Sequence, residues 1–193
     1  MSTPLAKLRR WVDEERLAGN PFSHGAVLGS VDAQGQAHTR MLGVHFDAQN
    51  YPRFHTSPTS RKVADLAQNP QASLTFAFQT SLRSVSLEGR LAALSVLRLD
   101  EDWLNLEPAF RRSYLVFGKN SGQAIESEAE LESELAGLAA QAGLIRPNYF
   151  IGYVFVEIQR IAFYSVGTKA FAEHEVWLFD QESKNWTKNF LVP

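Results

Sequence analysis

The sequence predicts an α+β protein with an antiparallel sheet of six or more strands, curled into a barrel with helices on its outside. Residues 71–78 alternate apolar and polar side chains, which is the pattern of a half-buried strand. The turn sequence DAQGQ at 32–36 joins two strand-like runs into a hairpin. Strands and helices are interspersed along one chain, and this order favours the α+β class.

The first half of the chain opens with a helix. Residues 4–17 have helical spacing, and GNP at 19–21 ends the helix. A second helix follows TSPTS and stops at Asn69–Pro70, a common exit signal. The strands expected in this half are 26–31, 37–46, 53–55, 71–78 and 85–91.

The second half is helical first and then strand-like. Residues 96–117 read as helix broken at Pro108, and 127–140 as an acidic amphipathic helix. Residues 149–164 are apolar on both faces, which predicts a strand buried on both sides. The strands 175–179 and 186–192 flank the turn DQESKN. Because no repeat or linker interrupts the chain, we expect one domain over 1–193, with its N-terminal helix in 1–19 and the barrel with packed helices in 20–193.

Composition narrows the function classes. The chain has 193 residues, 45% of them hydrophobic, with 19 Lys and Arg against 21 Asp and Glu. This balance gives no electrostatic footprint for nucleic acid or an anionic membrane. The absence of cysteine excludes disulfides and thiolate chemistry and fits a reducing compartment. With no signal-like apolar segment, we expect a cytoplasmic protein.

The stretch TSPTSRK at 56–62 stands directly before a helical pattern. Pro58 is a residue type favoured at the first helical position, with Ser57 or Thr59 as the capping residue. Free backbone N–H groups, the helix dipole, Arg61 and Lys62 together would also make a phosphate site. The residues alone leave both interpretations open, a solvated helix start or an anion cradle.

The other motifs indicate no specific catalytic or binding site. GAVLGS at 25–30 does not fit the dinucleotide-binding glycine pattern, and no Walker A sequence occurs. GKNSG at 118–122 lacks the spacing of a nucleophile elbow. The five histidines show no paired metal-ligand spacing, so we expect no metal centre.

Taken together, these segments resemble the pyridoxamine 5′-phosphate oxidase family and its relatives on the FMN-binding split barrel. RFHTSPTSRKVADLAQNPQASLTFAF is similar to the family pattern F-Y-T-N-x-x-S-R-K, helix, N-P, strand. RSVSLEGRL, GKNSGQAI, AFYSVG and the C-terminal W-x(4)-L-x-P follow in family order. The resemblance covers residues 20–193 and implies a split β-barrel with peripheral helices.

The resemblance also implies a cofactor and a partner. It assigns the phosphate of FMN to the TSPTSRK segment and the flavin to the interface of a homodimer. The implied flavin contacts from one chain are Arg40, Met41, Leu42, His45, His55, Thr56, Ser60, Arg61, Lys62 and Ser84; Asn120, Ser121 and Tyr164 are expected from the partner chain. A cation near the flavin ring favours its reduced form, and Arg40 or His45 could supply one. Arg40 could equally be a surface strand residue, and His45 a core histidine.

Departures from the family pattern concern the substrate more than the cofactor. The family's C-terminal R-x-H-D-R motif, which binds substrate and flavin, falls on 169–176 here and keeps neither arginine. His174 and Lys169 are the remaining candidates for substrate contact. Glu107 stands where the family carries a substrate arginine, and Arg111 or Arg112 could compensate.

The sequence therefore predicts an FMN-dependent oxidoreductase that acts on a small molecule of unassigned identity. Two alternatives remain, an authentic pyridoxine or pyridoxamine 5′-phosphate oxidase and a non-catalytic flavin carrier or sensor.

Overall fold

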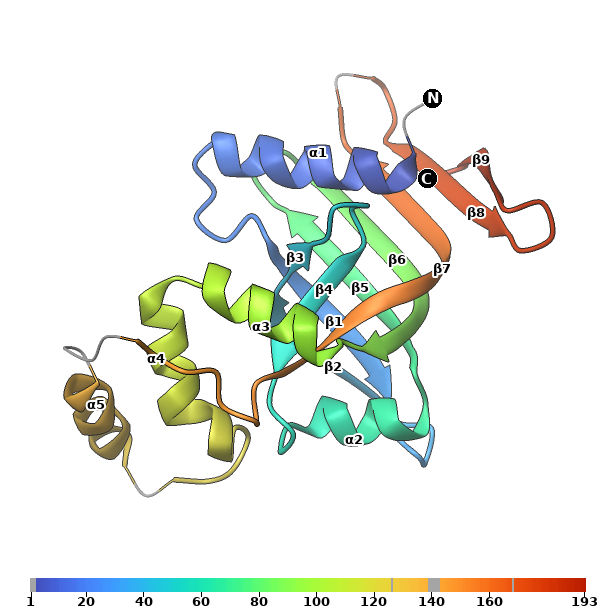
Figure 1. Ribbon diagram of the computed structural model, residues 1–193. Helices are drawn as coiled ribbons and strands as arrows, with labels where there is room; N and C mark the ends of the chain where they lie inside the picture. The colour runs from blue at the N-terminus through green and yellow to red at the C-terminus, as the bar shows by residue number, and fades with distance from the viewer. Residues whose placement is uncertain (1–2, 126, 139–142, 168) are drawn as a thin grey trace. The chain divides into compact units, whose positions relative to one another are not determined.

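The computed structural model describes residues 3–193 except 126, 139–142 and 168 (Figure 1). The chain forms two compact units. The first comprises Met1–Phe54, Asp65–Ala92 and Val154–Pro193, and the second comprises His55–Ala64 and Ala93–Tyr153. The elements are α1 Pro4–Leu17, β1 Gly25–Val31, β2 Ala37–Gly43, β3 His45–Phe46, β4 Pro52–Thr56, α2 Arg61–Gln68, β5 Gln71–Phe78, β6 Arg83–Ala93, α3 Val96–Asn105, α4 Pro108–Phe117, the 3₁₀ helix η1 Gly118–Asn120, α5 Glu128–Gly137, β7 Ile151–Ser165, β8 Glu173–Asp180 and β9 Asn185–Leu191.

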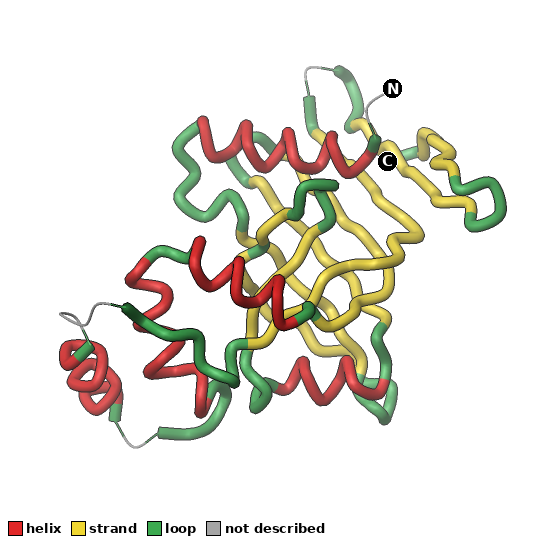
Figure 2. Tube along the Cα trace, in the orientation of Figure 1, coloured by secondary structure: helices red, strands yellow, loops and turns green. Residues whose placement is uncertain are grey.

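The sheet has nine strands among the described residues, in the order β2-β1-β5-β6-β7-β4-β3, with β8 pairing β7 and β9 pairing β8. The ladders whose register is defined are all antiparallel. Figure 2 shows the strands of the first unit curling round one another. The backbones of β6 and β7 come so close that a Cβ on Gly89 would lie 2.1 Å from the carbonyl oxygen of Glu157. The α+β class and the curled antiparallel sheet are confirmed.

The alternation that predicted β5 places its apolar side chains in the core of the first unit. Leu74, Phe76 and Phe78 are buried, and Leu74 lies opposite Leu87 of β6. Each fully buried side chain of this size contributes about 1.5–3 kcal/mol relative to an exposed one. The hydrophobic period therefore fixes both the register and the face that this strand turns inward.

Helix α1 packs along the same unit through its apolar face (Figure 1). Thr3 caps it by accepting a hydrogen bond from the backbone N–H of Ala6 at 3.2 Å, and Pro4 occupies its first turn. Leu8 is fully buried, and the Trp11 ring meets Phe163 of β7 edge-on with centroids 5.2 Å apart. The spacing that predicted this helix thus also supplies its buried face.

A buried carboxylate ties α1 to the C-terminal hairpin. Glu175 of β8 accepts hydrogen bonds from Lys7 of α1 at 2.7 Å, from Lys188 of β9 at 2.8 Å and from the indole of Trp177 at 2.5 Å. Burial alone would raise the pKa of Glu175, but the hydrogen bonds from Lys188, Lys7 and Trp177 lower it to about 2. The carboxylate is therefore ionised throughout the physiological range.

Glu175→Gln is expected to destabilise the fold by about 3 kcal/mol at pH 7, because the folded pKa lies well below the ordinary value of 4.5. A depressed folded pKa stabilises the protein above the unfolded pKa and loses that effect as pH falls from about 4.5 towards 2. Urea unfolding at pH 7 and pH 3 measures the difference, which should shrink at pH 3. Glu182→Gln, an exposed carboxylate in the next turn, is the matched control. An equal effect of both variants would contradict this account.

The second unit has its own small core. Leu99, Trp103, Leu144 and Phe150 are buried together, and the indole of Trp103 donates to the carbonyl of Leu144 at 2.8 Å. Ser95 caps α3 and Ser127 caps α5. None of the described helices is long and apolar enough to cross a membrane.

Two local expectations were wrong. The strand predicted over 37–46 is interrupted at Val44, where the chain changes partner: β2 pairs with β1, whereas β3 pairs with β4. The helix after TSPTS spans Arg61–Gln68 as predicted, but neither candidate capping residue, Ser57 or Thr59, directly precedes it. The Ser57 carbonyl instead accepts from the N–H of Ser60 at 3.1 Å in a turn ahead of the helix. The helix predicted over 127–140 is observed to Gly137; residues 139–140 lie outside the described residues.

Candidate functional site

A pocket of about 250 Å³ lies within the second unit, between the end of β4, the start of α2 and helix α4. Apolar rings and polar groups both contribute to its wall, as in ligand sites generally. The lining residues are His55, Thr56, Ser57, Lys62, Phe110, Ser113, Tyr114, Phe117, Gly118 and Ser121. Five of the residues singled out from the sequence therefore belong to or adjoin this pocket: His55, Thr56, Ser60, Lys62 and Ser121.

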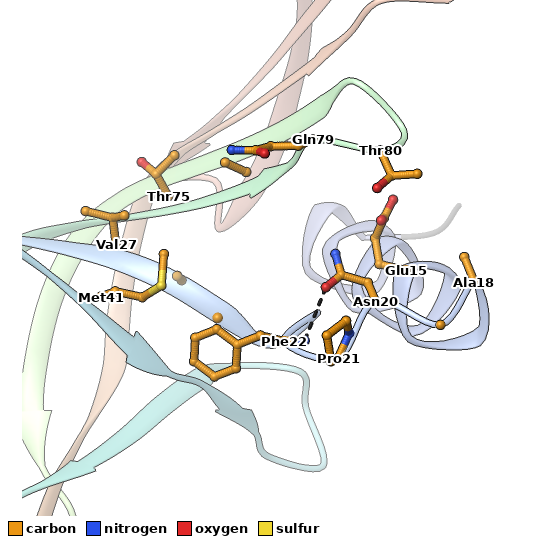
Figure 3. A pocket seen from close by; sticks show the side chains of 14 residues that line it. Glu15, Ala18, Asn20, Pro21, Phe22, Val27, Met41, Thr75, Gln79 and Thr80 are labelled. Atoms are coloured by element: carbon orange, nitrogen blue, oxygen red, sulfur yellow. Dashed lines mark hydrogen bonds between the residues drawn. The ribbon is translucent and has the colours of Figure 1, made fainter.

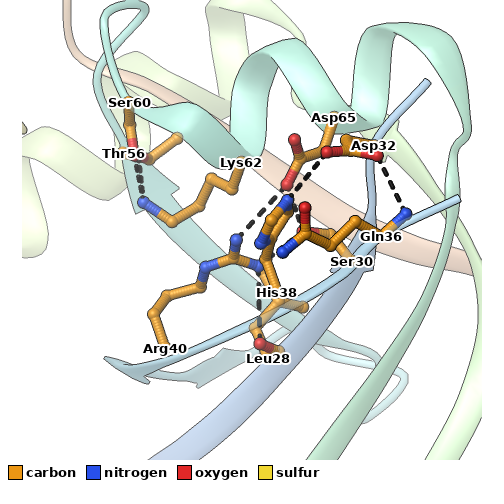
Figure 4. Close-up of polar contacts among 10 residues, drawn as sticks. All are labelled: Leu28, Ser30, Asp32, Gln36, His38, Arg40, Thr56, Ser60, Lys62 and Asp65. Atoms are coloured by element: carbon orange, nitrogen blue, oxygen red, sulfur yellow. Dashed lines mark hydrogen bonds and ion pairs between the residues drawn. The ribbon is translucent and has the colours of Figure 1, made fainter. Parts of the chain in front are cut away.

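A lysine held between two hydroxyls forms the polar end of the pocket. The Lys62 ammonium donates to Oγ1 of Thr56 at 3.1 Å and to Oγ of Ser60 at 2.5 Å (Figure 4). Thr56 is buried at the end of β4, and Ser60 directly precedes α2. We call Thr56, Ser60 and Lys62 the lysine–hydroxyl cluster. It combines a point charge with two hydroxyls beside a helix N-terminus, which is a donor set suited to an oxyanion.

A buried histidine forms the wall next to this cluster. His55 Nε2 lies 2.9 Å from Oδ2 of Asp102 in α3, and both side chains are about 95% buried. The imidazole stacks on Phe150 with centroids 4.7 Å apart. Burial raises the pKa of Tyr114, which also lines the pocket, so its phenol keeps its proton at physiological pH. The wall thus places a buried imidazole–carboxylate pair and a protonated phenol beside the cluster.

A side-chain hydrogen bond connects the cluster's loop to the segment after η1. The hydroxyl of Thr59 donates to the carbonyl oxygen of Ser121 at 3.0 Å. Ser121 therefore lines the pocket from the same chain as Lys62, although the resemblance suggested that it acts from the partner chain. Asn120, its neighbour, is exposed and is not among the lining residues.

Arg40 lies in the first unit and is already engaged there. Its guanidinium donates to Oγ of Ser30 at 2.6 Å and pairs with Asp65 at 3.3 Å, while Ser30 donates to the same carboxylate at 2.6 Å (Figure 4). Asp65 is buried, so the pair is protected from solvent. A ligand that contacts Arg40 would share it with this carboxylate.

Neighbouring residues of β2 face opposite sides of the sheet. Arg40 and Leu42 are partly buried on one side, whereas Met41 is 65% exposed on the other. Met41 lines a different cavity, of about 430 Å³, together with Phe22, Thr75 and Gln79 (Figure 3). The side chains of Arg40 and Met41 therefore cannot contact one ligand from the same face.

The chain's family follows from comparison with known proteins. The family model for pyridoxamine 5′-phosphate oxidase matches residues 17–135. The chain belongs to the pyridoxamine 5′-phosphate oxidase family. A pyridoxine/pyridoxamine 5′-phosphate oxidase of Sodalis glossinidius is 30% identical over 194 residues, covering 98% of this chain and 87% of that protein.

Solved structures agree with this family in fold. PhzG from Burkholderia lata 383, in complex with tetrahydrophenazine-1-carboxylic acid, superposes with a TM-score of 0.86 at 20% identity and covers 100% of this chain and 94% of that one. A pyridoxamine 5′-phosphate oxidase-related, FMN-binding protein from Nostoc punctiforme gives 0.82 at 15% identity and covers 100% of both chains. At these identities the likeness concerns the fold alone.

The region where family members carry R-x-H-D-R holds no arginine, and its carboxylates are paired. Lys169 forms an ion pair with Glu173, and Glu175 is held by Lys7 and Lys188. His174 meets the ring of Tyr164 edge-on, with centroids 5.9 Å apart. Both carboxylates here are thus paired with lysines, and residues 169–176 contain no arginine.

The remaining predicted residues are not among those that line the pocket. Arg61 is exposed at the start of α2, whereas Ser84 lies on β6 opposite Ala77 and His45 is exposed on β3. In α4, the Nε atom of Arg111 is buried and has no hydrogen-bond partner among the described residues. Within the described residues no group of three His, Asp or Glu side chains could hold a metal ion.

Sequence reasoning missed Asp102 and Tyr114. Asp102 reaches His55 across 47 positions, and no local spacing signals that pairing. Asp102 lies on the buried face of α3, and a buried carboxylate needs a partner. This was the signal that could have indicated the pairing.

Proposed function

We propose that the protein is an FMN-binding oxidoreductase whose lysine–hydroxyl cluster holds the cofactor phosphate. The observation that carries the proposal is the Lys62 ammonium fixed by Thr56 and Ser60 in a pocket wall. A phosphate needs a cation and several donors when it leaves water, and this cluster offers both.

The pocket fits one end of FMN and not the whole molecule. Its volume of about 250 Å³ is below the usual range of small-molecule sites, about 300–1,000 Å³. The phosphate and part of the ribityl chain would therefore occupy it, and the ring would extend beyond. The flavin contacts that the resemblance implies for Arg40, Met41, Leu42, His45, Ser84 and Tyr164 stay predictions.

The chain's own residues would bind, orient and exclude water. Bound FMN supplies the redox chemistry. Lys62 holds the anionic end, while the phenol of Tyr114 and the His55–Asp102 pair keep fixed donors beside it. In cofactor enzymes generally, the cofactor supplies the chemistry and the protein binds and orients it. Other residues would therefore determine which substrate is accepted.

A second candidate is oxidation of pyridoxine or pyridoxamine 5′-phosphate. It is favoured by the Sodalis relative of that name, which is 30% identical over 98% of this chain. The missing guanidinium groups in 169–176 argue against it. A flavin carrier without turnover is distinguished from both by whether the bound flavin is reduced and reoxidised by any substrate.

Purified protein is expected to carry flavin or take up added FMN, and to be a homodimer with two flavins. The exposed apolar side chains of the C-terminal hairpin, Leu178, Phe190 and Leu191, favour association because such surfaces gain by burial. Light scattering gives the mass, and the absorption spectrum with identification of the released chromophore gives the cofactor. A protein that neither contains nor binds FMN would refute the proposed function; a monomer that binds it tightly would refute the dimer alone.

A further inference from the structure

A third cavity, of about 320 Å³, lies wholly within the first unit. Helix α1, the loop before β1, and strands β3 and β4 build its wall. The lining residues are Arg9, Val12, Asp13, Arg16, Ser23, His24, Val44, His45, Phe46 and Arg53. This cavity plays no part in the proposed phosphate site, whose lysine–hydroxyl cluster lies in the second unit.

Positive charge dominates the lining of this cavity. It has three arginines and two histidines but a single carboxylate, Asp13, although the chain as a whole has a net charge of −2. Arg9 and Arg16 each pair with Asp13, at 3.0 and 3.7 Å, from partly exposed positions on α1. Exposed pairs of this kind are worth little, so an incoming anion can compete for both guanidinium groups.

The floor of the cavity is apolar and partly aromatic. Val12 and Val44 are buried beneath it, and the guanidinium carbon of Arg9 lies 5.2 Å from the centre of the Phe46 ring. Burial lowers the pKa of His24, so near neutral pH its imidazole offers one donor and one acceptor. A flat apolar body would pack on Phe46 while a charged end met the arginines.

We propose that this cavity binds a small planar organic carboxylate. Arginine forks match a carboxylate with two parallel hydrogen bonds, and three guanidinium groups surround a volume at the lower end of ligand-sized cavities. The requirement for an aromatic body distinguishes this ligand from a free phosphate ion. The inference does not depend on the cofactor assignment, because no lining residue belongs to the lysine–hydroxyl cluster.

Calorimetric titration of the purified protein with benzoate tests the proposal, with amide shift mapping on labelled protein to locate the site. Saturable binding is expected, with shifts at Val44 and Phe46 and weaker binding as salt rises. Arg9→Gln and Arg16→Gln should each weaken binding by about two- to fivefold, the range of partly exposed charge contacts. Benzamide, equally flat but uncharged, should bind much more weakly than benzoate.

Arg10→Gln is the matched control, because Arg10 sits on the same helix, pairs with Glu14 and does not line the cavity. It should leave benzoate binding unchanged. The proposal is overturned if benzoate does not saturate, if Arg10→Gln weakens binding as much as Arg9→Gln, or if the shifts map to Thr56 and Lys62. Equal binding of inorganic phosphate and benzoate would overturn the planar class.

Discussion

Lys62→Met is expected to weaken FMN binding by about 10- to 100-fold while it leaves riboflavin binding nearly unchanged. The ammonium is fixed by Thr56 and Ser60, so no large rearrangement is needed when a phosphate arrives. Hydrogen bonds to charged groups are worth about 1.5–3 kcal/mol, which corresponds to that loss. Quenching of flavin fluorescence on binding measures both ligands. Unmodified protein should prefer FMN over riboflavin.

The design separates loss of a contact from loss of the fold. Methionine keeps the length and apolar stem of the lysine, and Lys184→Met, in the exposed β8–β9 turn, is the matched control. Arg61→Ala should also weaken FMN binding, although Arg61 is exposed and its effect should be smaller. If Lys62→Met weakens FMN and riboflavin equally, the cluster does not hold the phosphate.

Pyridoxine and pyridoxamine 5′-phosphates are expected to be poor substrates, with kcat/KM below about 10⁴ M⁻¹s⁻¹, the lower end of ordinary enzymes. Residues 169–176 offer no arginine, and Lys169 is already paired with Glu173. A lysine in an exposed pair replaces a rigid guanidinium fork poorly. Steady-state oxidation by the FMN-loaded protein provides the measurement.

Comparison with the unphosphorylated vitamers sharpens this test. If no built phosphate site exists for the substrate, the phosphate gives no advantage, and the two forms should be oxidised at similar efficiency. A kcat/KM within about 10⁴–10⁸ M⁻¹s⁻¹ together with a strong preference for the phosphates would establish the vitamer oxidase instead. Arg111→Gln then tests whether the guanidinium group of Arg111, whose Nε is buried, replaces the missing arginines. If it does, this variant should lose the preference for the phosphates.

Local features of the fold were predictable because local physics decides them. Helix α1 was predicted with its observed ends, since Pro4 and GNP at 19–21 mark them in the sequence. Strand β5 was likewise predicted with its observed ends from its alternation. The break at Val44 was not predicted, because it marks a change of pairing partner from β1 to β4, and no local pattern reports which distant strand a residue pairs with.

The candidate site likewise has a part that local sequence predicts and a part that it does not. Thr56, Ser60 and Lys62 lie within seven positions, so one turn and one helix start bring them together. The His55–Asp102 pair depends on how α3 packs in the second unit, and no spacing rule reports it. The two faces of β2 could have been predicted, because side chains alternate along a strand and this places Arg40 and Met41 on opposite sides.

The hydrogen bond from Thr59 to the Ser121 carbonyl has a thermodynamic consequence. Thr59 lies between Thr56 and Lys62, so any anion that immobilises this turn also restrains the segment that follows η1. Such coupling is reciprocal: whatever restrains the segment must tighten anion binding by the same factor. A ligand or subunit that contacts residues 121–125 would therefore act on the affinity for the anion without touching Lys62.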